Sequence, residues 1–191
     1  MRLLHAGDHI VMPWKNGAGA TTQIAIAPPG ASLDSFDWRV SMAGVVEDGA
    51  FSTFPGIDRT LAVLEGEGIV LEVEGAPPRR LTGESEPAVF PGDVPTRAAL
   101  IGGPITDLNV MSRRGRHAHR LTRRIVDAPV TLAPGGGIML VLALSPGLRV
   151  GGERLERLDA AMLDAPTRIE ADHATICYVI ELWEVADGHG N

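Results

Sequence analysis

Seven polar or charged side chains in the first 110 residues have the types that recognise a small organic anion. They are Lys15, Asn16, Arg39, Ser41, Arg59, Asp107 and Asn109. An arginine fork pairs bidentately with a carboxylate, and amide and hydroxyl groups add directional hydrogen bonds. This combination predicts an apolar pocket that holds a small organic acid without needing a metal ion.

The arginine of this set that heads an apolar strand is Arg59. The apolar run Leu61–Leu64 follows it, and the glycine-containing connection Glu65–Gly68 leads to a second run, Ile69–Val73. Two short runs joined in this way predict a β-hairpin. Since side chains alternate along a strand, Arg59 shares a face with apolar residues. It is therefore either a salt bridge at the rim or the anchor of a bound anion.

Two further predicted strands carry polar residues at alternate positions. One face of Phe36–Val46 carries Arg39, Ser41 and Ala43, and one face of Ile105–Met111 carries Asp107, Asn109 and Met111. A solvated outer face would explain this pattern, because antiparallel sheets commonly expose one side to water. An inward face would leave room for a ligand, because the neighbouring residues are small. Both interpretations remain open from the pattern alone.

A tight turn precedes these strands. The run Trp14-Lys15-Asn16-Gly17-Ala18-Gly19 lies between a short strand, Ile10–Met12, and a second one, Thr21–Ala27. Asn-Gly is a strong signal for chain reversal. The turn is either only a hairpin connection or a segment whose Lys15, Asn16 and backbone N–H groups contact the ligand.

Metal and nucleophile signatures are weak in this sequence. Of the six histidines only His117-x-His119 has ligand-like spacing, and it lies in an arginine-rich segment that would repel a cation. No G-x-S-x-G, Walker loop or G-x-G-x-x-G motif is present, and Cys177 lies in an apolar run typical of an inert buried thiol. We therefore expect no catalytic residue, no metal site and no cofactor.

Charge and hydropathy narrow the choice of partners. The 191-residue chain has a formal net charge of −7, and its one basic segment, residues 112–124, lacks aromatic residues for base stacking. We expect that segment to be solvated and paired with carboxylates, and we expect no nucleic-acid partner. The longest aliphatic run, Ile138–Leu144, is too short for a bilayer, and the N-terminus lacks the pattern of a signal peptide. These features predict a cytoplasmic protein with no membrane partner.

The spacing of turns predicts an all-β fold. Many of the 23 glycines and 14 prolines separate short apolar runs, and the second half repeats the strand pattern of the first in outline. We expect two β-barrels or sandwiches in one compact unit, residues 1–115 and 116–191, with few short helices. The first strand region could cross over to the other barrel. A helix over Glu153–Met162 is the alternative to the strand and turn that the repeat predicts there.

Four ordered motifs cover roughly residues 10–115: MPWKNGAGATTQIA, FDWRVSMAGV, FSTFPGIDRTLAVLEGEG and DLNVMSRRG. Together they resemble the HutD/Ves family. The resemblance implies a bicupin fold with a pocket in the N-terminal barrel. The polar positions that the family shares fall on Trp14, Lys15, Asn16, Trp38, Arg39, Ser41, Asp58, Arg59, Asp107, Asn109 and Arg113.

The same resemblance implies a role beside the enzymes of histidine degradation, in which an intermediate such as urocanate or formylglutamate is bound. Ves-type relatives imply a link to stress instead. The sequence departs from metal cupins, since no His-x-His precedes Leu64 and no histidine follows Pro91-Gly92-Asp93. It also has Gln23 where many relatives carry an acidic residue.

Three hypotheses follow. The first is a metal-free protein that binds an organic acid, most simply not an enzyme, through Trp14, Lys15, Asn16, Arg39, Ser41, Arg59, Asp107 and Asn109. The second is a metal-free isomerase or epimerase, for which Asp58, Asp107 and Lys15 are the acid–base candidates. The third is an interaction module that forms a homodimer through sheet edges.

Overall fold

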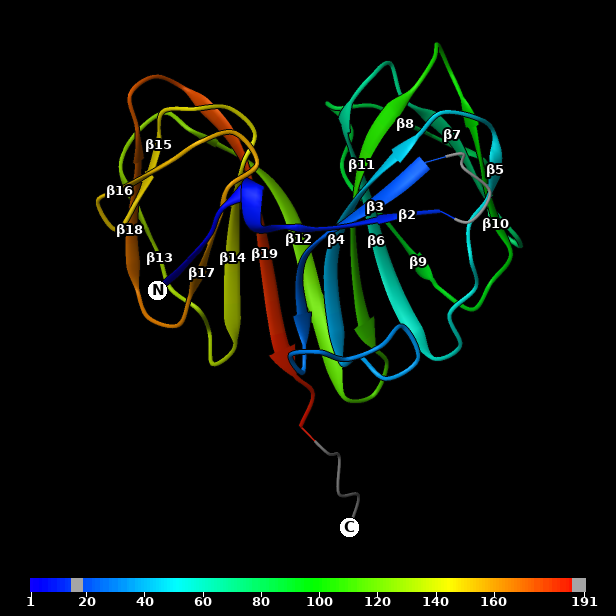
Figure 1. Ribbon diagram of the computed structural model, residues 1–191, viewed down its shortest axis with the longest axis horizontal. Helices are drawn as coiled ribbons and strands as arrows, with labels where there is room; N and C mark the ends of the chain where they lie inside the picture. Colours follow the sequence, from blue (N-terminus) through cyan, green and yellow to red (C-terminus); the bar gives the residue numbers. More distant parts are fainter. Residues whose placement is uncertain (15–18, 187–191) are drawn as a thin grey trace. The chain divides into compact units, whose positions relative to one another are not determined.

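The computed structural model describes residues 1–14 and 19–186, which form an almost entirely β protein (Figure 1). The one helical segment in these residues is a 3-10 turn, η1 (Ala6–Asp8). The chain divides into two compact units. We call the unit of Ile10–Ala118 the N-terminal barrel, and the unit of Met1–His9 with His119–Glu184 the C-terminal barrel. No helix in the described part of the chain is long and apolar enough to cross a membrane.

The N-terminal barrel has two antiparallel sheets. The six-stranded sheet has the order β2 (Ile10–Pro13), β3 (Gly19–Ala27), β4 (Trp38–Val45), β11 (Ile105–Arg113), β6 (Ile57–Glu65) and β9 (Ala88–Pro91). The four-stranded sheet has the order β5 (Gly49–Ala50), β10 (Thr96–Leu100), β7 (Ile69–Val73) and β8 (Arg79–Leu81). Apolar side chains from both sheets form one core that includes Leu61, Val63, Ile69, Leu71 and Phe90.

The C-terminal barrel is built in the same way. Its five-stranded sheet has the order β1 (Arg2–Leu4), β17 (Ala160–Leu163), β14 (Ile138–Ala143), β19 (Thr175–Glu184) and β12 (His117–Val126). Its four-stranded sheet has the order β13 (Val130–Leu132), β18 (Thr167–Ala171), β15 (Leu148–Val150) and β16 (Glu153–Leu155). The core between them is apolar and includes Val141, Leu148, Val150, Leu163 and Cys177.

Strand order makes the two barrels an internal repeat. The two large sheets share four strands in the same order, β4-β11-β6-β9 in the N-terminal barrel and β12-β19-β14-β17 in the C-terminal barrel. The two four-stranded sheets correspond strand for strand, β5-β10-β7-β8 to β13-β18-β15-β16. The all-β architecture and the repeat predicted from turn spacing are therefore confirmed. The segment Glu153–Met162 contains β16, a turn and the start of β17, as the repeat predicted, and no helix.

The predicted β-hairpin across Glu65–Gly68 is wrong. Strand β6 pairs with β11 and β9, whereas β7 pairs with β10 and β8 in the other sheet. Gly66 and Gly68 both adopt positive φ, 89° and 116°, and the connection carries the chain from one sheet to the facing one. A glycine-rich link between two apolar runs looks the same for a hairpin and for a crossing between sheets, because strand alternation reports faces and not partners.

Among the described residues, ion pairs with carboxylates form at three of the six arginines of the basic segment 112–124, Arg114, Arg116 and Arg120, so the expected pairing holds for half of them. Arg114 contacts Asp58 at 2.8 Å and Asp93 at 3.0 Å, and Arg116 contacts Asp37 at 3.0 Å. The segment thus closes the end of β11 and begins β12.

Candidate functional site

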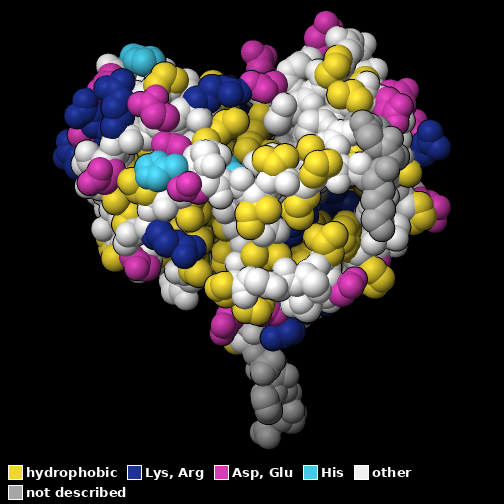
Figure 2. Space-filling model, viewed as in Figure 1, with side chains coloured by type: hydrophobic (Ala, Val, Ile, Leu, Met, Phe, Trp, Pro, Cys, Tyr) yellow, Lys and Arg dark blue, Asp and Glu magenta, His cyan; other side chains and the backbone are white. Residues whose placement is uncertain are grey.

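A cavity of about 660 Å³ lies in the N-terminal barrel. Three neighbouring strands of the large sheet, β4, β11 and β6, supply most of its charged and polar wall, and Glu47 and Asp48 also line it. Apolar and aromatic residues of β2 and of the segment 47–54 supply much of the rest. In the space-filling view a hollow ringed by hydrophobic side chains opens beside β2, and basic side-chain atoms are visible inside it (Figure 2).

Strand register places the polar side chains in rows across the sheet. Arg39, Met111 and Arg59 form one row, because Met111 pairs with Arg39 on one side and with Arg59 on the other. Asn109 pairs with Ser41 and forms a second row, two residues along β11 from the first. Asp107 pairs with Ala43 and forms the third. The two arginine backbones are therefore about 10 Å apart, and Asp107 lies about 13 Å further along β11 than the arginine row.

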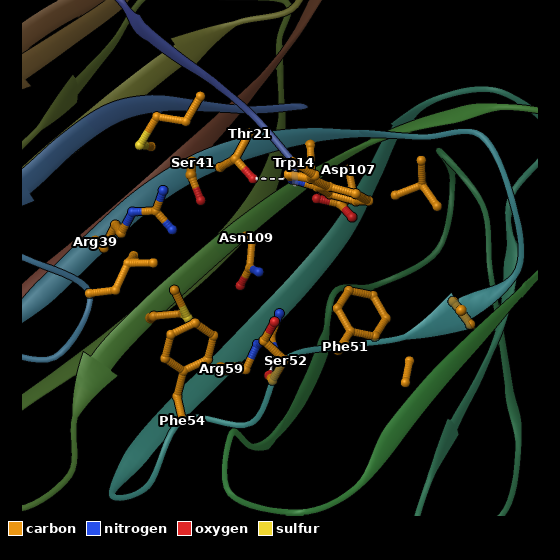
Figure 3. Close-up of a pocket in the computed structure, with 18 of the residues that line it drawn as sticks. Trp14, Thr21, Arg39, Ser41, Phe51, Ser52, Phe54, Arg59, Asp107 and Asn109 are labelled. Atoms are coloured by element: carbon orange, nitrogen blue, oxygen red, sulfur yellow. Dashed lines mark hydrogen bonds between the residues drawn. The ribbon is translucent and has the colours of Figure 1, made fainter. Parts of the chain in front are cut away.

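Six of the eight predicted site residues line this cavity (Figure 3). They are Trp14, Arg39, Ser41, Arg59, Asp107 and Asn109. The inward interpretation of the alternating polar residues is therefore the one that the structure has, and the solvated face is not. Lys15 and Asn16 lie outside the described residues. Whether the six residues bind a ligand remains a prediction.

Arg59 is a buried cation with an aromatic enclosure. The residue is 3% exposed, and the carbon of its guanidinium lies 4.9 Å from the ring centre of Phe51, 5.8 Å from that of Phe54 and 5.3 Å from that of Phe90. Its Nη1 donates a hydrogen bond to the Ser52 carbonyl oxygen at 3.1 Å. Its Nε is buried and has no partner among the described residues. Ring faces stabilise a guanidinium electrostatically without consuming its N–H donors, so the fork remains available for an anion.

Burial lowers the pKa of Arg59 to about 10, which still leaves the group charged at neutral pH. The nearby carboxyl of Asp107 opposes this shift, and the charge of Arg39 adds to it. A buried cation without an ion-pair partner is costly. An anion beside Arg59 would offset this cost.

Arg39 is the second cation of the wall. It is buried, and its Nε donates to Oε1 of Gln23 on the adjacent strand at 3.0 Å. Burial lowers the pKa of Arg39 as well. Neither guanidinium forms an ion pair with a carboxylate of the described residues. Gln23 orients Arg39 through a neutral amide oxygen, so the positive charge of the fork is left uncompensated.

Asp107 and Asn109 place hydrogen-bond acceptors at the other end of the cavity. Asp107 is 1% exposed, and neither of its carboxylate oxygens has a hydrogen-bond partner of ordinary geometry in the described part of the chain. Desolvation raises the pKa of Asp107 to about 7, and the charge of Arg59 and the backbone N–H of Ala43 offset part of that rise. Oδ1 of Asn109 is also buried without a described partner.

Trp14 covers this acceptor end. Its Nε1 donates to Oγ1 of Thr21 at 2.8 Å, which fixes the ring directly after the end of β2. Figure 3 shows the Trp14 ring beside Asp107 and away from the two arginines. The indole thus forms an apolar wall at the end of the cavity that lies away from the guanidinium groups.

Three of the polar positions implied by the family resemblance lie outside the cavity. Asp58 is held by Arg114 in an ion pair, so it is not placed for acid–base chemistry in the pocket. Arg113 donates to the carbonyl oxygens of Phe36 at 3.0 Å and of Asp34 at 3.2 Å. Trp38 is buried and lines no part of the cavity. Their roles in the structure are in packing and in joining loops.

The donor set of the cavity suits an anion better than a metal ion. Among the described residues that line it there is no histidine and no cysteine. In residues 1–14 and 19–186, no group of three or more His, Cys, Asp or Glu side chains has metal-site geometry. His117 and His119 therefore belong to no such group.

The aromatic enclosure of Arg59 is the feature that sequence reasoning missed. Three of the four phenylalanines of the chain surround this one side chain. The run Phe51-Ser52-Thr53-Phe54, directly before the strand of Arg59, was the available signal. Two aromatic residues in a turn-rich connection are unusual enough to suggest that they pack on something specific.

Comparison with protein families supports the assignment by motif. The family model HutD matches residues 6–179 of the chain. The chain is 37% identical over 160 residues to an uncharacterized 21.2 kDa protein in the hutC 3′ region of Pseudomonas putida, which covers 83% of the chain and 82% of that protein. It is 38% identical over 132 residues to protein Ves of Citrobacter koseri, with 68% and 66% covered.

Solved structures agree. HutD from Pseudomonas fluorescens SBW25, determined in a formate condition, superposes with a TM-score of 0.83 at 33% identity over 97% of this chain and 99% of that one. A cupin 2 conserved barrel domain protein from Leptotrichia buccalis matches at 12% identity with a TM-score of 0.58, over 90% and 92% of the two chains. That likeness concerns the fold alone, and it confirms the prediction of cupin-like barrels.

Proposed function

The chain belongs to the HutD family, and from that premise we propose that its N-terminal barrel binds a small organic acid and thereby modulates histidine catabolism. The P. putida relative lies in the hutC 3′ region, which supports the link to histidine utilisation. The proposed ligand is a pathway intermediate such as urocanate or formylglutamate. The protein acts in this proposal as a sensor or buffer, with no metal ion in the binding step.

The observation that carries the proposal is the state of Arg59. Its guanidinium is 3% exposed, enclosed by aromatic rings, and has no ion-pair partner among the described residues. A second uncompensated guanidinium, that of Arg39, lies in the same row of the sheet. Paired arginine forks in a largely apolar cavity are suited to one carboxylate of a compact ligand.

Isothermal titration calorimetry tests this proposal with urocanate, formylglutamate and histidine as ligands. We expect saturable heat for at least one of the acids, and a loss of that heat in Arg59→Ala. Arg97→Met is a matched control, because Arg97 is an exposed arginine of the same barrel outside the cavity. Folded protein that gives no heat with any of the three would contradict the proposal.

A second candidate function has one observation in its favour. The pKa of Asp107 is raised to about 7 in a cavity next to Asn109, which is the range that a general acid or base needs. This would suit a metal-free isomerase or epimerase. NMR spectra of the pathway acids incubated with the protein distinguish the two, because catalysis produces new resonances and binding alone does not.

A further inference from the structure

We propose that Asp107 and Asn109 form a second recognition subsite, so that the ligand is a carboxylic acid with N–H donors at the end away from its carboxylate. This inference rests on the proposed function, since it assumes that the arginine row holds the carboxylate. It adds the chemical class of the rest of the ligand and the residues that select it.

Unsatisfied hydrogen-bonding groups in the cavity are divided by type. At the arginine row the atom without a described partner is Nε of Arg59, which is a donor. On β11 the atoms without described partners are both carboxylate oxygens of Asp107 and Oδ1 of Asn109, which are acceptors. Buried polar atoms are nearly always paired in folded proteins. A ligand that satisfied both ends would present acceptors to the first and donors to the second.

The geometry keeps the two ends apart. Asp107 and Met111, which stands in the arginine row, are four residues apart on β11, or about 13 Å along the strand. The long arginine side chains reduce the span to be bridged, and Asn109 lies between the two ends on the same face. Figure 3 shows Asp107 beside Trp14 at one side of the cavity, Arg39 at the opposite side, and the Arg59 guanidinium below Asn109 between them.

The chemistry at Asp107 selects for hydrogen-bond donors in either protonation state. As a carboxylate it offers two acceptor oxygens, and as a neutral carboxyl it still offers a carbonyl oxygen. A second carboxylate of a ligand would be repelled by the ionised form. A methyl group would leave the buried oxygens unpaired, which weakens binding. Amide or azole N–H groups satisfy the subsite without either penalty.

A matched pair of probes tests the inference. Glutarate monoamide and 5-oxohexanoate have the same length and charge, and differ in that the terminal amide NH2 of the first is a methyl group in the second. The monoamide of adipic acid and 6-oxoheptanoate extend the pair by one methylene. We expect the better amide acid to bind the wild-type protein at least tenfold more tightly than its ketone isostere. Asp107→Ala removes the two unpaired oxygens without orphaning a partner, so the variant should fold and lose this preference.

Each result decides the matter. Equal affinity for amide and ketone would overturn the subsite and leave the arginine site standing, because both probes carry the carboxylate. A preference that persists in Asp107→Ala would overturn the assignment to Asp107. If no probe of either pair binds, the carboxylate site itself fails and the inference falls with it. Arg97→Met is the control that should keep the full preference.

Discussion

At three matching positions that face the barrel interior, the N-terminal barrel has charged or polar side chains and the C-terminal barrel has apolar ones. In the N-terminal barrel these are Arg59, Asp107 and Asn109, and in the C-terminal barrel they are Met139, Cys177 and Val179. The match follows from register, because the rows Arg59–Met111, Leu61–Asn109 and Val63–Asp107 between β6 and β11 correspond to Met139–Glu181, Val141–Val179 and Ala143–Cys177 between β14 and β19.

The same strand arrangement therefore has an apolar core at these positions in the C-terminal barrel and a polar-walled cavity in the N-terminal barrel, while a smaller pocket of about 230 Å³ lies beside Met139 and Glu181 in the C-terminal barrel. Met139, Val141, Ala143, Cys177 and Val179 belong to one apolar core cluster of the C-terminal barrel. Their counterparts on β6 and β11 include two charged groups beside a cavity of about 660 Å³. Buried unpaired charges destabilise a fold, so a barrel that retains them sacrifices stability for something other than packing. The comparison teaches that only one of the two repeats carries the polar wall, which is why we propose the binding site in the N-terminal barrel.

The largest expected effect on stability comes from placing an acidic residue in the apolar core of the C-terminal barrel. Cys177→Asp would bury a carboxylate at a fully buried position where burial already raises the pKa of the thiol to about 11. We expect the free energy of unfolding to fall by about 4 kcal/mol or more. Cys177→Ala, the control for lost volume, should cost about 1–2 kcal/mol. Urea denaturation measures both, and equal stability of the two variants would mean that the C-terminal interior tolerates charge.

The reciprocal change replaces a charged residue of the N-terminal cavity by the apolar residue found at the matching position of the C-terminal barrel. Arg59→Met installs the residue of the matching position, and we expect affinity for the organic acid to fall at least 100-fold, or roughly 3 kcal/mol. The free energy of unfolding should stay level or rise, because a buried cation is replaced by an apolar side chain of similar length. Calorimetry and urea denaturation report the two quantities separately. Lost binding together with a large loss of stability would indicate that Arg59 has a structural role.

A smaller effect is expected from the pH dependence of Asp107. Its pKa is about 7 in the folded protein and about 3.8 in the unfolded chain, so the folded state holds more protons between these values. Stability from this group is therefore full below pH 4 and is lost as the pH rises through 7. Complete burial would make the loss about 4 kcal/mol, and because the cavity opens to the surface we expect solvent screening to reduce it to about 2 kcal/mol.

Asp107→Asn removes that titration while keeping the shape of the side chain. Its free energy of unfolding should exceed that of the wild type at pH 8 and match it near pH 4. A parallel pH profile of the two proteins would show that Asp107 is ionised at its ordinary pKa. Cys177→Ala should leave the pH profile unchanged between pH 4 and 8, because the thiol titrates well above that range.

The alternation of side chains along strands correctly predicted which polar residues share a face in the cavity wall. Arg39 with Ser41, and Asp107 with Asn109, were expected to share faces, and each pair lines the cavity. The choice between an inward and a solvated face could not be made from the pattern, because an amphipathic strand looks alike in both cases. The family motifs supplied the expectation of a pocket in the N-terminal barrel.

Contacts between distant segments could not be predicted. The enclosure of Arg59 needs Phe90 from a strand 31 residues further along the chain and Phe51 from a preceding loop. The hairpin prediction failed for a related reason, since the partner of β7 is β10 and sequence proximity favoured β6. Period-two patterns define which side chains share a face, while strand pairing depends on the closed barrel as a whole.

The most direct test of the central claim observes the guanidinium groups themselves. In protein with 15N-labelled arginine, the Nε–H resonance of Arg59 is identified by its absence in Arg59→Met, and is then followed while urocanate or formylglutamate is added. We predict that this proton resonance shifts downfield as Nε gains a carboxylate acceptor. The shift should saturate, and its titration curve should give the same dissociation constant as calorimetry. Saturable heat with the Arg59 and Arg39 resonances unmoved would contradict the account.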